Sequence, residues 1–287
     1  MFLYDEIVDR ALREDLGTGD LSTLIIPEDY LGEAKLYAKE AGIVCGIPLV
    51  EKVFKKVNSN IEIYSNVKDG DVVFPGMLVM VVKGTLAGIL QSERTALNFL
   101  QHLSGISTYT RQLVDLVQDL GVKVVDTRKT MPGMRLLQKY AVRIGGGQNH
   151  RFGLYDAVML KDNHLAAVGG LKEAVQQVKD KVGHTVKIEV ECETLEQVKE
   201  ALDCGVDIIM LDNMSLEDMR AAVKLINHQS IVEASGGITA ESIRAIAQTG
   251  VDIISVGRLT HSVKSIDFSL VIDDQKPSIQ KHIATIK

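Results

Sequence analysis

Residues 208–257 read IIMLDNMSLEDMRAAVKLINHQSIVEASGGITAESIRAIAQTGVDIISVG, and three apolar runs in this stretch each end in polar or glycine residues. The runs begin at residues 208, 231 and 253, so they are 23 and 22 residues apart. Such an interval accommodates one strand, a turn and one helix, which is the repeat of a parallel β/α fold. Parallel strands are covered on both faces, and continuous apolar runs suit that environment. The stretch therefore predicts consecutive β/α units.

The same pattern extends towards the N-terminus, with further apolar runs beginning at residues 122, 157 and 187. About six units are fewer than the eight of a complete barrel, so we expect an incomplete (β/α) barrel. A doubly wound open sheet is the main alternative. It requires a glycine fingerprint after its first strand, and the string GGGQNH at residues 145–150 does not fit GxGxxG.

The segment before the barrel has a different pattern. Residues 33–90 contain short β-rich segments separated by glycines, with one helix at about residues 48–57. The longest apolar stretch, residues 79–90, is interrupted by a lysine and two glycines, and we expect strand and turn there. From residue 93 to 120 apolar residues recur at helical spacing, and a break at Gly105 would divide this stretch into two helices.

Composition restricts the class of protein. The chain has 287 residues, of which 46% are hydrophobic and 24% charged, which excludes disorder as its main state. A net charge of -6 argues against binding to nucleic acid or to an acidic membrane surface. No run approaches the ~20 apolar residues of a membrane-spanning helix. Three cysteines without CxxC spacing indicate a reducing compartment, and we expect a cytoplasmic protein.

Charge is concentrated in one part of the predicted barrel. Residues 123–161 contain eight cations and two acids, a local charge of +6, so the rest of the chain carries -12. Arg128, Lys129 and Lys161 directly follow apolar strands and should point into the barrel mouth, where unpaired charges need an anionic partner. We therefore expect a small ligand with several negative charges. A solvated helix face would explain the remaining cations Lys123, Arg135, Lys139 and Arg143.

Two acids and two glycine turns follow other strands of the same barrel. Glu191 and Asp212 could be salt-bridge partners of the cations, or they could bind sugar hydroxyls or Mg²⁺, which proteins often hold with one or two carboxylates and substrate phosphates. Ser235-Gly236-Gly237 and Ser255-Val256-Gly257 end the last two strands, where barrels usually bind phosphate through backbone N–H groups. Tight βα turns are the alternative interpretation of these glycines.

Taken in order, these motifs resemble the quinolinate phosphoribosyltransferase family, the carboxylating nicotinate-nucleotide pyrophosphorylases. The resemblance extends over nearly the whole chain, with two small departures at Met131 and Arg258. The matching strings are EDLGTGD at 14–20, ERTALNFLQHLSGI at 93–106, DTRKTMPG at 126–133, GGGQNHR at 145–151, LKDNH at 160–164, EVE at 189–191, MLDN at 210–213, EASGGI at 233–238 and SVGRLTHS at 255–262.

The resemblance implies a two-domain α/β enzyme. Residues 1–105 with the tail 266–287 would form an N-terminal α/β open-faced sandwich, and residues 106–265 the incomplete barrel of a phosphoribosyltransferase. Such an enzyme transfers phosphoribosyl from phosphoribosyl pyrophosphate to quinolinate, giving nicotinate mononucleotide, pyrophosphate and CO2 in NAD biosynthesis. It also implies a homodimer as the smallest active unit, with a hexamer possible, and Mg²⁺ as the cofactor.

The matched motifs also imply roles for individual residues. Lys129, Lys161, Glu191 and Asp212 would be catalytic, and Glu191 with Asp212 would hold Mg²⁺, directly or indirectly. Arg94 would come from the partner subunit, or would form only a salt bridge of its own helix or interface. The expected quinolinate and pyrophosphate contacts are Arg94, Thr127, Arg128, Lys129, His150, Arg151 and Lys161. The expected 5′-phosphate contacts are Ser235, Gly236, Gly237, Ser255, Val256 and Gly257.

Two other functions compete with this one. A Schiff-base lyase would also place a lysine such as Lys161 at the end of a barrel strand, but it would not need so many cations together with two acids. A paralogous transferase or binding protein linked to molybdate transport would use the same scaffold. The nearly complete set of cations argues against it.

Overall fold

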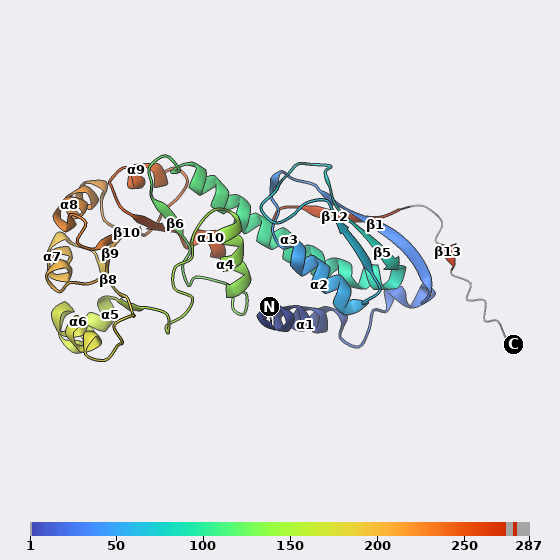
Figure 1. The fold of residues 1–287 in the computed structure, drawn as a ribbon, viewed down its shortest axis with the longest axis horizontal. Helices are drawn as coiled ribbons and strands as arrows, with labels where there is room; N and C mark the ends of the chain where they lie inside the picture. Colours follow the sequence, from blue (N-terminus) through green and yellow to red (C-terminus); the bar gives the residue numbers. More distant parts are fainter. Residues whose placement is uncertain (1, 274–277, 280–287) are drawn as a thin grey trace. The chain divides into compact units, whose positions relative to one another are not determined.

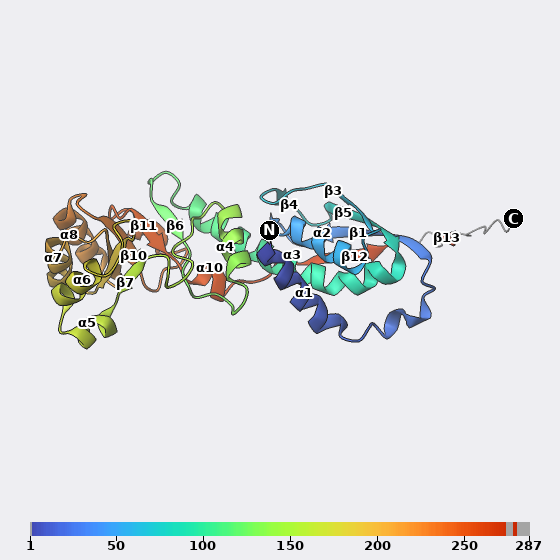
Figure 2. The same cartoon turned by 60° about the horizontal axis from the view of Figure 1, so that its bottom comes forward.

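The structure is a computed structural model that describes residues 2–273 and 278–279 (Figures 1 and 2). The chain divides into two compact units, residues 1–108 with 263–287 and residues 109–262. The other residues of the predicted C-terminal tail, 274–277 and 280–287, lie outside the described part. No helix within that part is both long and apolar enough to cross a membrane.

The first unit is built on an antiparallel sheet with the strand order β12-β1-β5-β3. In β1, Ala34, Leu36 and Ala38 are buried, whereas the alternate residues Lys35 and Tyr37 are partly exposed. This alternation is typical of a sheet covered on one face. The elements are α1 (Phe2–Leu16), η1 (Ser22–Ile25), β1 (Tyr30–Ala38), β2 (Gly42–Ile43), α2 (Ile47–Val57), β3 (Glu62–Ser65), β4 (Val72–Val73), β5 (Leu78–Thr85), β12 (Phe268–Ile272) and β13 (Ser278–Ile279).

A single helix, α3 (Leu86–Asp115), replaces the two helices that a break at Gly105 would have produced. Gly105 is needed for packing, because a Cβ atom there would collide with the carbonyl oxygen of Lys264. The segment that approaches the helix is fixed by a hydrogen bond from Ile266 N to Gln101 O of 3.1 Å. The helix also begins earlier than expected, so the predicted strand and turn of residues 79–90 is wrong beyond Thr85.

The second unit contains a six-stranded parallel sheet with the order β6-β11-β10-β9-β8-β7. Its path ends at β6 and β7, which are not paired with each other among the described residues, as expected of an incomplete barrel. Helices lie outside the sheet in Figure 1. The elements are β6 (Lys123–Val125), α4 (Arg135–Ile144), β7 (Val158–Leu160), α5 (Asp162–Val168), α6 (Leu171–Lys179), β8 (Ile188–Cys192), α7 (Leu195–Asp203), β9 (Ile208–Asp212), α8 (Leu216–Ile226), β10 (Ile231–Ser235), α9 (Ile243–Ala247), β11 (Ile253–Ser255) and α10 (Arg258–His261).

The register of this sheet brings the carboxyl ends of its strands together. Asp212 of β9 pairs with Ser235 of β10, and Ser255 of β11 pairs with Val125 of β6. Residues that are far apart in the sequence thus end at one edge of the sheet. In parallel barrels this edge carries the active site.

Candidate active site

A cavity of about 140 Å³ lies at the carboxyl ends of the parallel strands. Its lining contains four lysine or arginine side chains and no carboxylate. Seven of its nine lining residues were predicted as site residues, and the two that were not are Met159 and Met210. The lining consists of Thr127, Arg128, Lys129, His150, Arg151, Met159, Lys161, Met210 and Ser255.

The other predicted residues lie outside this lining. Glu191 is next to it, because its carboxylate forms an ion pair with Lys161. Arg94 lies on α3 in the first unit, where its side chain is exposed. The remaining predicted residues at the ends of β9, β10 and β11 are Asp212, Ser235, Gly236, Gly237, Val256 and Gly257.

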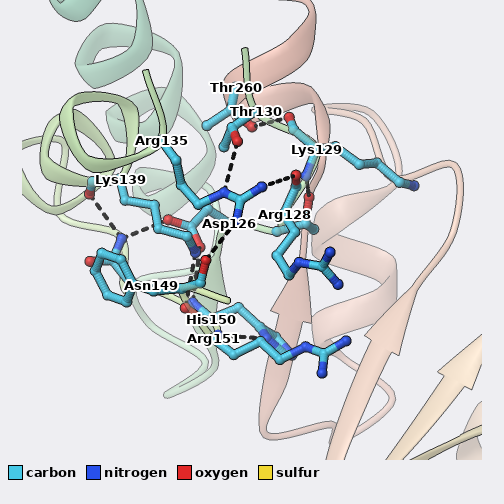
Figure 3. Close-up of polar contacts among 12 residues, drawn as sticks. Asp126, Arg128, Lys129, Thr130, Arg135, Lys139, Asn149, His150, Arg151 and Thr260 are labelled. Atoms are coloured by element: carbon cyan, nitrogen blue, oxygen red, sulfur yellow. Dashed lines mark hydrogen bonds and ion pairs between the residues drawn. The ribbon is translucent and has the colours of Figure 1, made fainter. Parts of the chain in front are cut away.

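A buried ion pair supports the cationic side of the cavity (Figure 3). Asp126 follows β6, and its carboxylate pairs with Lys139 of α4, both side chains being fully buried. Asn149 Nδ2 donates to the same carboxylate at 2.6 Å, and the backbone N–H of His150 donates to it at 2.9 Å. The expectation that Lys139 lies on a solvated helix face is therefore wrong, because α4 turns this side chain inward towards Asp126.

Burial dominates the ionisation of this pair. Loss of hydration raises the pKa of Asp126, against the opposing effects of Lys139 and the other donors. Burial likewise lowers the pKa of Lys139, and the attraction of Asp126 opposes that shift. The Nζ atom of Lys139 also donates to the carbonyl of His150 at 2.9 Å and lies 5.1 Å from the ring centre of Phe152. Asp126 and Lys139 therefore link the loop after β6 to the segment that carries His150.

The loop after β6 is held by hydrogen bonds to its backbone. Thr127 Oγ1 accepts from the backbone N–H of Lys129 at 3.0 Å, and the hydroxyl of Thr260 donates to the carbonyl of Lys129 at 2.8 Å. Arg135 is half-buried and donates to Thr130 Oγ1 at 3.0 Å, so it too is not simply a solvated cation. Figure 3 shows the side chains of Arg128 and Arg151 directed to the same side, away from the buried pair.

His150 lies between two buried carboxylates. Its Nε2 atom is 3.1 Å from Glu189 of β8 and 3.5 Å from Glu233 of β10, and both carboxylates are at most 2% exposed. The Oε1 atoms of both glutamates have no hydrogen-bond partner. Burial opposes the charged imidazole, but the hydrogen bonds to Glu189 and Glu233 outweigh it and raise the pKa of His150 to about 10.

The turn after β10 has a backbone that requires glycine. Gly236 has a φ of +100°, and a Cβ atom there would collide with the side chain of Asn213. Gly237 follows with a φ of +59°. Asn213 itself donates its backbone N–H to Ser235 O at 3.0 Å, which joins the ends of β9 and β10. The glycines thus permit a close approach of two neighbouring strand ends.

A larger cavity, of about 610 Å³, lies at the opposite edge, around residues that precede the strands. The carboxylates in its lining already bind partners within the protein. Asp207 pairs with Lys187 and accepts the backbone N–H of Ile188 at 2.9 Å, and Asp252 accepts that of Val232 at 2.8 Å. We therefore place the active site at the smaller, cation-lined cavity.

Comparisons with known proteins identify the family. Residues 20–104 match the N-terminal domain of quinolinate phosphoribosyl transferase, and residues 106–271 match its C-terminal domain. The chain belongs to the quinolinate phosphoribosyl transferase family. It is 45% identical over 276 residues to a probable carboxylating nicotinate-nucleotide pyrophosphorylase of Bacillus subtilis, covering 96% of each chain.

Two further members of the family show how widely the similarity extends. A chloroplastic carboxylating nicotinate-nucleotide pyrophosphorylase of Arabidopsis thaliana is 43% identical, covering 94% of this chain and 82% of that protein. The crystal structure of NadC from Streptococcus pyogenes matches with a TM-score of 0.91 and 45% identity, covering 95% of this chain and 98% of that one. The predicted family, fold class and enzyme class are thereby confirmed, and the molybdate-linked alternative is not favoured.

Four residues next to the cation-lined cavity were missed as functional candidates. Asp126, Lys139, Glu189 and Glu233 are all buried, and all connect to His150. Glu189 and Glu233 could have been found from the sequence, because each is a charged residue inside an otherwise apolar strand. A charge at such a position needs a partner when it is buried.

Proposed function

We propose that this protein joins quinolinate to phosphoribosyl pyrophosphate through the cavity at the carboxyl ends of the strands, with Mg²⁺ as cofactor. One observation carries this assignment. The cavity gathers Arg128, Lys129, Arg151 and Lys161 without a carboxylate in its lining, although the protein is acidic overall. Quinolinate carries two carboxylates, and phosphoribosyl pyrophosphate carries a phosphate and a pyrophosphate. Charge-assisted hydrogen bonds to such groups are the expected use of these four cations.

The cations would bind the substrates and stabilise the departing group. The pyridine nitrogen displaces pyrophosphate from the anomeric carbon, so negative charge develops on the pyrophosphate oxygens as the bond breaks. We expect Lys129 and Lys161 to stabilise that charge, because both line the cavity and neither is buried. Once the nitrogen is quaternary, the ring accepts the electron pair released as the adjacent carboxylate leaves as CO2. The carbanion is then protonated.

Glu191 and Asp212 suit a divalent cation in this scheme. Both are half-buried carboxylates at the carboxyl ends of β8 and β9, and oxygen ligands of this type are those that Mg²⁺ prefers. Mg²⁺ bound there with substrate phosphates would neutralise charge on the pyrophosphate. Glu191 also orients Lys161 through their ion pair. Asp212 accepts a hydrogen bond from Asn213 Nδ2 at 2.7 Å, which fixes one of its oxygens.

The two glycine turns would bind the 5′-phosphate. Ser235-Gly236-Gly237 and Ser255-Val256-Gly257 end neighbouring strands, and such turns present backbone N–H groups to an anion. A Cβ atom on Gly257 would lie 3.0 Å from Lys129 Cδ, so the absence of a side chain lets the aliphatic part of Lys129 pack against this turn.

The minimal active unit is a homodimer, with a homohexamer possible, and Arg94 reaches the partner subunit's cavity. Arg94 is exposed, and among the described residues it forms no hydrogen bond or ion pair, so the alternative of an intrahelical salt bridge has no support. An exposed arginine is available to an anionic substrate bound elsewhere in an assembly. A cytoplasmic location suits the three free cysteines.

Product analysis tests the proposed reaction. The purified protein incubated with quinolinate, phosphoribosyl pyrophosphate and Mg²⁺ should yield nicotinate mononucleotide, pyrophosphate and CO2, and chelation of Mg²⁺ should stop turnover. Nicotinate, which lacks one carboxylate, should be a poor substrate because cations meant for that group would remain unpaired. Equal turnover of the two acids would refute the assignment. Borohydride trapping of a carbonyl substrate on Lys161 would instead indicate a lyase.

A further inference from the structure

His150 differs from the cations of the cavity because its polar atoms are all engaged within the protein. Its backbone N–H donates to Asp126, and its carbonyl accepts from Lys139, at 2.9 Å each. Its ring Nδ1 atom lies 2.7 Å from the backbone nitrogen of Arg151. Nε2 faces Glu189 and Glu233. No polar atom of His150 is therefore left for a direct hydrogen bond to a substrate.

The hydrogen-bond pattern also fixes the protonation of Nε2. Carboxylates can only accept hydrogen bonds, so the imidazole nitrogen that faces Glu189 and Glu233 carries a proton. That proton points at Glu189, with Glu233 as the second acceptor. The carboxylates are thus hydrogen-bond acceptors for a single N–H, and their position sets the plane of the ring.

We infer that Glu189 and Glu233 are positioning residues that hold His150 by its Nε2–H, so that the imidazole meets the pyridine ring of the substrate with its face. This inference rests on the proposed function. His150 lines the cavity with Met159 and Met210, so the lining combines cations with flat or apolar surfaces. A planar aromatic diacid matches both, because its ring can pack on these surfaces while its carboxylates meet the cations.

A metal ion is the competing explanation for the same cluster. The ligand atoms of His150, Glu189 and Glu233 lie within 4.8 Å of one another. However, the carboxylate of Glu189 already acts electrostatically on the guanidinium of Arg151, which is itself repelled by Arg128. The protein thus supplies positive charge next to the carboxylates, which disfavours a further divalent cation there.

Two double variants separate the hydrogen bond from the charge. Glu189→Gln with Glu233→Gln keeps an acceptor for Nε2–H but removes both charges, and the quinolinate KM should stay within about threefold of wild type. Glu189→Leu with Glu233→Leu removes the acceptors as well, and that KM should rise roughly tenfold or more. The KM of phosphoribosyl pyrophosphate should change less. Glu196→Gln with Glu217→Gln, on exposed helix positions, controls for the lost charge.

Equal effects of the glutamine and leucine pairs would overturn the positioning role. Should the leucine variant fail to fold, ¹⁵N NMR of the wild-type histidines decides the question without kinetics. The His150 signal, assigned by its loss in His150→Gln, should show a protonated Nε2 both before and after quinolinate is added. An unprotonated Nε2 would contradict the inference. So would stoichiometric Zn²⁺ binding that the glutamine variant abolishes.

The two proposals fail in different ways. A wild-type protein that does not convert quinolinate refutes the proposed function, while the protonation of His150 Nε2 in the ligand-free protein still tests whether Glu189 and Glu233 fix the ring. An active enzyme whose quinolinate KM is unchanged in a folded leucine variant keeps the proposed function and refutes the inference.

Discussion

Two lysine–carboxylate pairs lie at or next to the cation-lined cavity, and they differ in their access to water. Asp126 and Lys139 are 0% exposed, and their charges also bind Asn149 and the backbone of His150. Lys161 is 43% exposed and Glu191 15%, and Lys161 lines the cavity. A buried charge cannot change its partner without a large desolvation cost, whereas an exposed one can. The first pair therefore supports the site, and the second is available for exchange with an anionic substrate.

The largest expected effect is on stability, in the buried pair. Lys139→Met leaves the Asp126 carboxylate buried without its countercharge, and the free energy of unfolding should fall by about 3–5 kcal/mol. Denaturant titration monitored by circular dichroism measures it. Lys161→Met is the matched control, and there the loss should be below about 1 kcal/mol. Similar losses in both variants would show that burial does not distinguish the two pairs.

The next effect is on rate, in the exposed pair. Lys161→Ala, like Lys129→Ala, removes a charge-assisted contact to the substrates, which should cost about 2–4 kcal/mol of transition-state stabilisation, or roughly 30- to 1000-fold in kcat/KM. Steady-state kinetics with both substrates measures it. The thermal melting temperature should stay near that of wild type. A large fall in melting temperature accompanying the loss of rate would show that these lysines stabilise the fold.

A third prediction asks whether the cavity needs a cation from another subunit. Arg94→Ala and Lys129→Ala should each be inactive alone. In a mixed dimer, one site carries both defects and the other carries neither. Co-refolding should therefore restore up to roughly a quarter of the wild-type activity, because random pairing gives about half heterodimers with one intact site each. If the subunits are shown to exchange and no activity returns, Arg94 either acts in the cavity of its own subunit or has only a structural role.

The smallest effect concerns a pair in which both side chains are about half exposed. Arg244 of α9 donates to Asp119 at 2.7 and 2.8 Å, and this hydrogen bonding lowers the pKa of Asp119 below its ordinary 3.8. A depressed carboxyl pKa adds stability above the unfolded value, and that stability is lost as the pH falls through the folded value. Arg244→Ala should thus melt slightly lower at pH 7, and the difference from wild type should shrink as the pH falls below 3.8 and vanish below the lowered pKa of folded Asp119. If the difference in melting temperature persists in acid, Arg244→Ala destabilises the protein through lost packing and not through the lost ion pair.

The sequence could predict much of the barrel and of its cavity because both depend on local patterns. Apolar runs at the β/α interval predicted six strands, and six were found in one parallel sheet. Polar residues after those runs were expected to converge, since parallel strands place their carboxyl ends at one edge. Thr127, Arg128 and Lys129 indeed share the cavity lining with Lys161, more than thirty residues away.

Tertiary structure alone decided which charges are buried and what they bind. Lys129 and Lys139 are both lysines of the cation-rich stretch, yet one is exposed at the cavity and the other is fully buried against Asp126. The direction in which α4 packs sets that difference, and no periodicity in the sequence encodes it. Likewise, Glu189 and Glu233 acquire a partner only because the barrel brings two strands and the His150 segment together. Local spacing sets strand ends, whereas burial and partner choice depend on contacts between distant segments.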